Sequence, residues 1–176
     1  MCLIFYEESS IWVGKEIYNI DFTAMDNFKI MLFGKTYKEE KVFPSFSSLT
    51  KEEVDEEYMK FNAESGYDKL HEGLLTYFEK HGLFLKGQNA LDSHFDVKDF
   101  LKLIGLPIAK YVYLVWGDFE SIDKMIFTDF VQFFSDIWYP SYENLTFYFD
   151  NSKYMVFVHH GGILYLYIAE KHLGDF

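Results

Sequence analysis

Arginine is absent from the sequence. The 16 basic residues are all lysines and are outnumbered by 28 acidic ones, which gives a formal net charge of −12 at pH 7. Binding to DNA or RNA depends on neutralising phosphates with clustered lysine and arginine, and the bidentate arginine contact with guanine or phosphate is not available here. Nucleic acid is therefore not an expected partner, and the acidic surface favours a basic protein instead.

Cysteine and long apolar runs are also scarce. Cys2 is the single cysteine, so an internal disulfide is excluded, and its place at the start of the chain makes it a poor nucleophile candidate. The chain opens with no signal-peptide pattern, and no apolar run approaches the length of about 20 residues that crosses a bilayer. We expect a protein of the reducing cytoplasm that binds no membrane.

Motifs of catalysis and cofactor binding are incomplete. The Gly-Lys-Thr tripeptide at residues 34–36 ends like a phosphate-binding loop, but Lys29 stands where that loop requires its first glycine. His71 begins a zinc-protease pattern, but Leu75 stands where the second histidine is required. No Gly-x-Ser-x-Gly nucleophile elbow is present. The sequence therefore predicts no catalytic residue, no cofactor and no metal site.

Aromatic residues are abundant, with 20 Phe and 14 Tyr in 176 residues. Such a chain can bury enough apolar surface to fold, and its length suits one domain over residues 1–176. Three runs near the end are rich in β-branched and aromatic residues: Leu145 to Phe149, Tyr154 to His159 and Ile163 to Ile168. Turn residues separate them, which predicts a three-stranded antiparallel meander.

Both faces of this meander carry apolar or aromatic side chains, because alternate strand residues point to opposite faces. The last strand places Leu164, Leu166 and Ile168 on one face and Ile163, Tyr165 and Tyr167 on the other. In a sheet with one face exposed to water, polar residues would occupy every second position along each strand. We therefore expect both faces to be covered, by the chain's own helices or by a partner.

Helices are predicted before the sheet. Thr50 and Glu53 form a capping box that begins a helix, which Gly66 interrupts or bends and Gly82 ends. Residues 96–104 fit a short helix with Phe100 inward. Thr128 can cap another helix, in which Val131, Phe134 and Trp138 share a face.

The remaining segments complete an α+β pattern. Residues 21–33 fit a helix closed by Gly34, although Phe28, Ile30 and Leu32 also fit a strand. Residues 83–93 are predicted as a loop, and residues 111–116 as a strand. The expected fold is α+β, with N-terminal helices packed on a C-terminal antiparallel sheet that ends in the meander.

Two groups of residues are candidates for binding a partner. The first is the acidic cluster Glu52, Glu53, Asp55, Glu56 and Glu57. The positive end of the helix dipole explains about half of these acids, and the rest form either a solvated face or a docking face for lysines and arginines. The second group is Tyr148, Tyr165 and Tyr167, which belong either to the core or to an interface.

The dipeptide His159-His160, followed by two glycines, is a candidate metal-binding or catalytic site, because imidazole binds metals and acts as a general base. Adjacent strand residues face opposite ways, so a turn is the favoured interpretation. The alternative is a small hydrolase or metal-dependent enzyme in which these histidines converge with Asp or Glu. A third interpretation is a homo-oligomer whose aromatic sheet face packs against itself.

The end of the chain also carries a resemblance. Its residues are Ile137-Trp138-Tyr139-Pro140-Ser141, then Asn144-Leu145-x-Phe147-x-Phe149-Asp150, then Val156-Phe157-Val158-His159-His160-Gly161-Gly162. This ending resembles that of small acidic immunity-type proteins from bacterial polymorphic and contact-dependent toxin systems. The resemblance implies a non-enzymatic protein that binds a cognate toxin and blocks it, through surfaces that differ between such proteins. We expect electrostatic capture by the face from Glu52 to Glu57, followed by aromatic contacts that occlude the toxin's active site.

Overall fold

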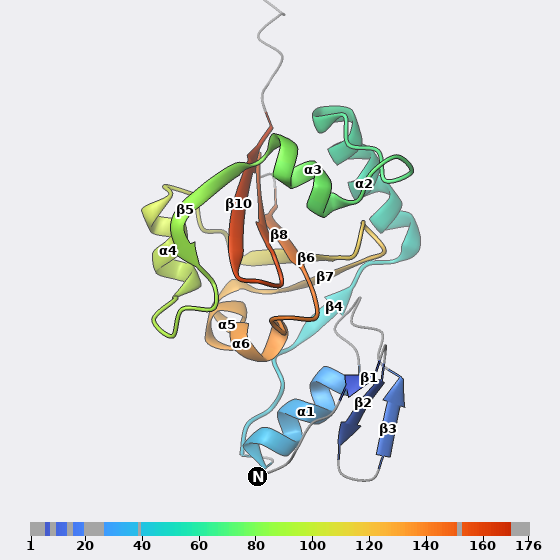
Figure 1. The fold of residues 1–176 in the computed structure, drawn as a ribbon, viewed down its shortest axis with the longest axis vertical. Helices are drawn as coiled ribbons and strands as arrows, with labels where there is room; N and C mark the ends of the chain where they lie inside the picture. Colours follow the sequence, from blue (N-terminus) through green and yellow to red (C-terminus); the bar gives the residue numbers. More distant parts are fainter. Residues whose placement is uncertain are drawn as a thin grey trace, which may run out of the picture.

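A seven-stranded antiparallel sheet forms the centre of the molecule (Figure 1). The structure, a computed structural model, describes residues 6–7, 10–13, 16–19, 27–38, 40–150 and 153–169. The strands are β4 (Phe46–Ser48), β5 (Leu83–Asn89), β6 (Tyr111–Trp116), β7 (Ser121–Ile126), β8 (Leu145–Phe149), β9 (Tyr154–Val158) and β10 (Ile163–Ile168). They lie in the order β4-β7-β6-β8-β9-β10-β5. A separate small sheet joins β1 (Tyr6–Glu7), β2 (Ser10–Val13) and β3 (Glu16–Asn19).

The predicted meander is confirmed. Strands β8, β9 and β10 are neighbours in the sheet, with Leu145 and Leu164 both opposite Val158. The strand predicted over residues 111–116 is β6, which joins the meander to β7. The α+β class is therefore confirmed, although the sheet also recruits β4 and β5 from the first half of the chain.

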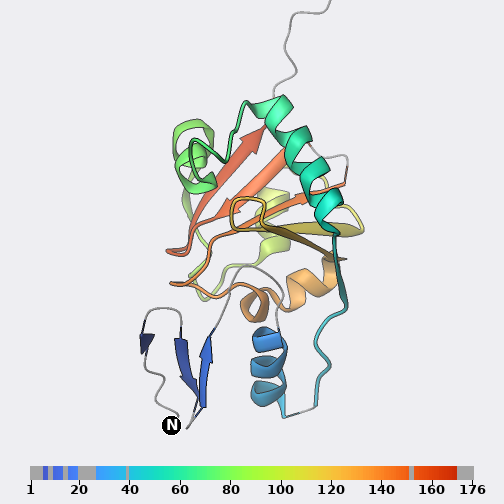
Figure 2. The ribbon, with the colours of Figure 1, turned by 90° about the vertical axis from the view of Figure 1, so that its right-hand side faces the viewer.

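Six helices accompany this sheet in the described residues: α1 (Asn27–Tyr37), α2 (Lys51–Ser65), α3 (Leu74–His81), α4 (Val97–Leu103), α5 (Phe127–Gln132) and α6 (Phe134–Ile137). Helices α2 and α3 pack on one face of the sheet, and α4, α5, α6 and the buried Phe33 of α1 pack on the other (Figure 2). The chain's own helices thus cover both faces, as the alternation predicted. Helices α2 and α3 lie over the aromatic face, on which Tyr148, Tyr165 and Tyr167 are half-buried.

The two faces of the seven-stranded sheet pack into different hydrophobic clusters. Leu164 and Leu166 lie in the cluster beneath α4, α5 and α6, together with Trp116 and Trp138. Tyr165 and Tyr167 pack on the opposite cluster. That second cluster consists of Val54, Phe61, Tyr67, Leu74, Tyr77, Phe78, Val115, Phe119, Ile122, Met155 and Phe157. Each large apolar side chain buried in this way stabilises the fold by roughly 1.5–3 kcal/mol relative to exposure.

The loop predicted over residues 83–93 is wrong for residues 83–89, which form β5. Strand β5 pairs with β10 at Phe84 and Tyr165 and again at Asn89 and Ile163, with a bulge between the two pairings. Gly87, which has a φ of 83°, lies in this bulge. The glycine that suggested a loop therefore marks a bulge at a sheet edge, which is a common way to blunt an exposed edge.

Strand β7 was not predicted because Asp123 and Lys124 interrupt its apolar pattern. The Asp123 side chain is nevertheless buried. Its carboxylate accepts hydrogen bonds from Trp116 Nε1, at 2.9 Å, and from the Ser48 hydroxyl. A buried acidic side chain is tolerated where hydrogen-bond donors satisfy it, so an acidic residue of this sequence lies inside the sheet.

Helix α1 confirms the helical prediction for its segment and contradicts the strand alternative. The helix runs through Gly34, which was expected to close it, and ends at Tyr37, before Lys38 with a φ of 48°. The proposed cap at Asp21 lies outside the described residues. Thr36 donates its hydroxyl to the Leu32 carbonyl at 2.9 Å, as in a helix, so residues 34–36 form no phosphate-binding loop.

The helix predicted from Thr128 is divided. Helix α5 is capped by Ile126 rather than by Thr128, and Phe133 separates it from α6. Phe134 and Trp138, which were predicted to share the inward face, are both buried. Apolar positions identified the inward face correctly, but Phe133 is itself buried and breaks the continuous helix.

The capping box of α2 is confirmed. The Thr50 hydroxyl accepts from the Glu53 amide, the Glu53 carboxylate accepts from the Thr50 amide at 2.8 Å, and Gly66 ends the helix with a φ of 73°. We expect Thr50→Ala to lower the free energy of unfolding by about 1 kcal/mol, because a helix amide loses its acceptor. Urea denaturation measures this, and Thr50→Ser is the matched control. An equal loss in both variants would contradict the capping role.

Candidate functional site

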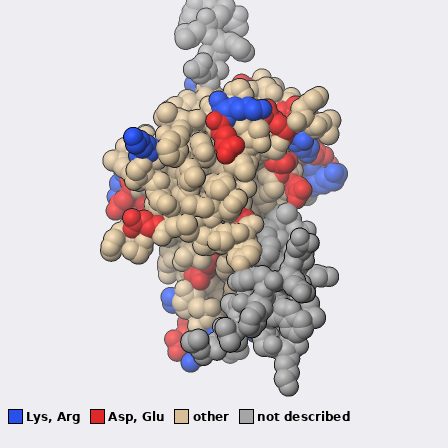
Figure 3. All heavy atoms as spheres, in the orientation of Figure 1, with Lys and Arg blue, Asp and Glu red and all other residues tan. Residues whose placement is uncertain are grey.

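The acidic cluster divides along α2. Glu52, Glu53, Asp55 and Glu56 are exposed, whereas Glu57 is half-buried. Val54 and Phe61 face the core, so the exposed acids occupy the outer side of the helix. Acidic and basic side chains gather in the region of α2 and α3 in Figure 3. Most of the predicted docking face is therefore exposed on the outer side of α2.

The three candidate tyrosines share one environment. Tyr148, Tyr165 and Tyr167 are half-buried at the border of the second core cluster. The Tyr148 hydroxyl donates a hydrogen bond of 2.9 Å to the Glu57 carboxylate. The two groups predicted separately from the sequence thus meet at this contact, 91 positions apart in the chain.

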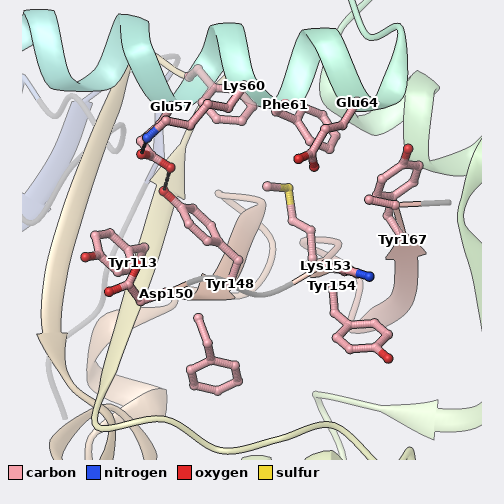
Figure 4. Close-up of a pocket in the computed structure, with 14 residues that line it drawn as sticks. Glu57, Lys60, Phe61, Glu64, Tyr113, Tyr148, Asp150, Lys153, Tyr154 and Tyr167 are labelled. Carbon is pink, nitrogen blue, oxygen red and sulfur yellow. Dashed lines mark hydrogen bonds and ion pairs between the residues drawn. The ribbon is translucent and has the colours of Figure 1, made fainter. Parts of the chain in front are cut away.

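A pocket of about 430 Å³ opens around this contact. Glu57, Tyr148 and Tyr167 line it, whereas Tyr165 and the other four acids do not. Figure 4 shows α2 along one side and the side chains of the sheet along the other. The complete lining is Glu57, Lys60, Phe61, Glu64, Tyr113, Phe119, Tyr148, Phe149, Asp150, Lys153, Tyr154, Met155, Tyr167 and Ala169.

Hydrogen bonds and ring contacts fix the Glu57 side of this pocket. Lys60 donates to Glu57, one helical turn away, and Glu57 also accepts from Tyr148. The Tyr148 ring stacks on Tyr113, with centroids 5.1 Å apart and planes 13° apart. Burial, and then the charge of Glu57, raise the pKa of Tyr148 above its usual range, so its phenol stays protonated and donating.

Acidic side chains surround Lys60 in the second half of α2. The pKa of Lys60 is raised, first by its hydrogen bond with Glu57 and then by the charges of Glu57, Glu56 and Asp150. Lys60 is exposed, so this shift marks the sign of the field and carries little stability. A cation entering the pocket would meet carboxylates on both walls.

Buried apolar side chains form the floor of the pocket. Phe61, Phe119 and Met155 are buried there. The Phe119 ring stacks on Phe61, with centroids 5.5 Å apart, although its backbone has a φ of 63°. A bulky residue in this left-handed region is strained and persists only where its surroundings hold it.

Sequence reasoning missed several lining residues. The positions 57, 60, 61 and 64 share one side of α2, and this helical spacing was readable from the sequence. Asp150 directly follows β8 and Lys153 directly precedes β9, and no local pattern indicates that they lie near α2. Their assignment requires the tertiary packing of the helix on the sheet.

Tyr67 lies next to this site in the same cluster and is fully buried. Its hydroxyl has no hydrogen-bond partner among the described residues. Burial, and then the Asp118 charge, raise its pKa. An unpaired buried hydroxyl costs about 1–3 kcal/mol.

We therefore expect Tyr67→Phe to leave the free energy of unfolding unchanged or to raise it by about 1 kcal/mol, measured by urea denaturation. Tyr77→Phe is the control, because the Tyr77 hydroxyl donates to the Ser65 carbonyl at 2.8 Å. This control should lose about 1 kcal/mol. A comparable loss in Tyr67→Phe would show that its hydroxyl is bonded to Asp118.

The two histidines form a turn. The Gly162 amide donates to the His159 carbonyl at 2.7 Å, and the His160 amide donates to Asn144 Oδ1 at 2.9 Å. Gly162 has a φ of 81°, as the turn interpretation required. Burial, and then the charge of His160, lower the pKa of His159, so its ring is neutral at neutral pH.

Across the described residues, no group of three or more His, Cys, Asp or Glu side chains is arranged to hold a metal ion. Within the same part of the chain, none of the helices has both the length and the apolar character that spanning a membrane requires. Comparison with protein-family models, curated proteins and solved structures gave no match to this chain.

Proposed function

We propose that this chain is a cytoplasmic, single-domain, non-enzymatic protein that binds a basic partner protein through α2 and the adjoining pocket. The observation that carries the proposal is the hydrogen bond between Glu57 and Tyr148. This contact joins an acidic helix surface to an aromatic pocket, and the two together suit a partner with cationic and apolar groups. Charges increase the rate of association, and buried aromatic contacts supply affinity.

The specific form of the proposal is toxin neutralisation. It is supported by the resemblance of residues 137–162 to the ending of immunity-type proteins and by the excess of 28 acidic over 16 basic residues. In this form, the exposed acids of α2 attract a basic toxin domain, and contacts at the pocket then block its active site. The toxin would be encoded beside this chain.

Growth of a host cell that expresses the toxin domain from the adjacent gene tests this function. Co-expression of this chain should restore growth, and the purified pair should form a stable complex. Growth arrest that persists when both proteins are expressed and folded would contradict the proposal.

Association kinetics test the capture step separately. The triple variant Glu52→Gln/Asp55→Asn/Glu56→Gln removes three exposed charges and leaves the capping box and Glu57 in place. We expect its association rate with the toxin domain to fall about tenfold at low salt, because electrostatic steering is lost. The control variant Glu40→Gln/Glu79→Gln/Asp99→Asn removes the same charge from exposed positions outside α2 and its neighbouring surface. Association rates that do not change with salt would contradict electrostatic capture.

A further inference from the structure

The pocket beneath α2 combines three features that together select a cationic ligand. It is large enough for a long side chain, its floor is apolar, and aromatic rings form much of its wall. Tyr113 and Tyr148 present a stacked pair on one side, and the Tyr167 ring contacts Phe61 edge-on with centroids 5.4 Å apart. Aromatic faces attract cations through the ring quadrupole.

The carboxylates of the pocket are not all engaged. Glu57 is bonded to Lys60 and Tyr148. Glu64 and Asp150 line the pocket from α2 and from the end of β8, and neither makes a hydrogen bond or ion pair with a described residue. In Figure 4 the Glu64 carboxylate extends from α2 into the space between the helix and the sheet. Two carboxylates therefore remain for a ligand.

Phe61 and Met155 also line the pocket and are buried, so an apolar stem that carries the cationic group would contact them. Arginine meets both requirements better than lysine. Its planar guanidinium stacks on aromatic rings, binds a carboxylate bidentately and is less strongly hydrated than an ammonium group. We infer that the pocket receives an arginine side chain of the partner protein, with Glu64 as the principal acceptor. This inference rests on the proposed function, because it names the group that the partner inserts.

Lys153 limits the affinity of this site. Its ammonium group lies at the pocket and repels a second cation. Removing this charge should therefore strengthen binding, whereas removing the Glu64 charge should weaken it. These opposite effects are specific to a cationic ligand, because a neutral ligand would respond little to either change.

The test is an NMR titration of the full chain with the blocked peptide Gly-Gly-Arg-Gly-Gly, monitoring the methyl groups of Met155 and Ala169. Both residues line the pocket. The matched peptides contain citrulline, which is the neutral isostere of arginine, or lysine at the central position. We expect the arginine peptide to bind at least about tenfold more tightly than the citrulline peptide and about threefold more tightly than the lysine peptide.

Variants of the pocket residues identify the carboxylate that accepts hydrogen bonds from the arginine guanidinium. Glu64→Gln should weaken binding of the arginine peptide about tenfold, Asp150→Asn should weaken it less, and Lys153→Gln should tighten it about threefold. Glu40→Gln is the control, because Glu40 is exposed and outside the pocket. Circular dichroism and thermal midpoints confirm that each variant is folded.

Equal binding of the arginine and citrulline peptides, or shifts that Glu64→Gln leaves unchanged, would overturn the inference. So would an absence of methyl shifts at millimolar arginine peptide. If the toxin domain still binds while the arginine peptide does not, the inference fails and the proposed function stands. If the arginine peptide binds while the toxin domain does not, the pocket chemistry holds and the proposed function fails.

Discussion

Lys29→Met is expected to lower the free energy of unfolding by about 3–5 kcal/mol, because it leaves a buried carboxylate without its counter-ion. The side chains of Lys29 and Glu143 are 0% and 4% exposed. Lys29 Nζ donates to both oxygens of Glu143, at 2.9 and 2.8 Å, and lies 3.8 Å from the centroid of the Trp116 ring. Methionine conserves much of the volume, so the loss measures charge rather than packing. Urea denaturation at pH 7 gives the value.

Two further variants separate the causes of that loss. Lys29→Met/Glu143→Gln should recover part of the stability, because the uncompensated charge is removed while an acceptor remains for the Tyr139 amide, now 2.8 Å from Glu143. Lys35→Met changes an exposed lysine on the same helix and should cost less than about 0.5 kcal/mol. A loss below about 1 kcal/mol in Lys29→Met would show that the pair does not hold α1 on the sheet.

The Lys29–Glu143 pair illustrates the limit of sequence reasoning for this chain. Lysine is seldom fully buried, and no local pattern distinguishes Lys29 from a surface lysine. Its partner is 114 positions away, in the segment between Trp138 and β8. Such a pair arises only when a helix and a distant loop are packed together, and neither segment specifies this alone.

Elements with strong local signals were predictable. The capping box at Thr50 and the glycine at 66 determine where α2 begins and ends through local hydrogen bonds. The β-branched and aromatic runs of the meander, separated by turn residues, gave β8 to β10 nearly residue by residue. Alternation also predicted that both sheet faces are covered, because it depends only on the geometry of a strand.

The edges of the sheet were harder because tertiary pairing overrides weak local preference there. Strand β5, at one edge, contains Gly87 in a bulge, and β7, next to the edge strand β4, contains a buried aspartate, so both departed from simple strand patterns. The candidate site shows the same contrast between local patterns, which the sequence reveals, and tertiary contacts, which it does not. Glu57 and Tyr148 were identified as members of two separate groups, but their contact, and the place of Glu64 and Asp150 beside it, depend on how α2 lies on the sheet.

Phe157→Ala is expected to cost about 3–5 kcal/mol, because it opens a cavity in the cluster beneath α2 and α3. Phe157 is 1% exposed on β9, and its ring stacks on Phe78 of α3 with centroids 4.9 Å apart. Phe84→Ala is the control on the edge strand, where the ring is 52% exposed, and it should cost about 1 kcal/mol or less. Urea denaturation compares the two, and equal losses would contradict the packing role of the Phe157–Phe78 contact.

The same variant separates stability from binding. Phe157 belongs to the cluster that supports the pocket floor, through Phe61 and Met155, but it does not line the pocket itself. At a temperature where Phe157→Ala remains folded, its affinity for the arginine peptide should stay within about twofold of the original protein, because the substitution removes no side chain that lines the pocket. A loss of affinity as large as that of Glu64→Gln would show that the pocket and the α3 side of the core move as one unit. In that case, the packing of α3 on β9 would control the site as directly as its carboxylates do.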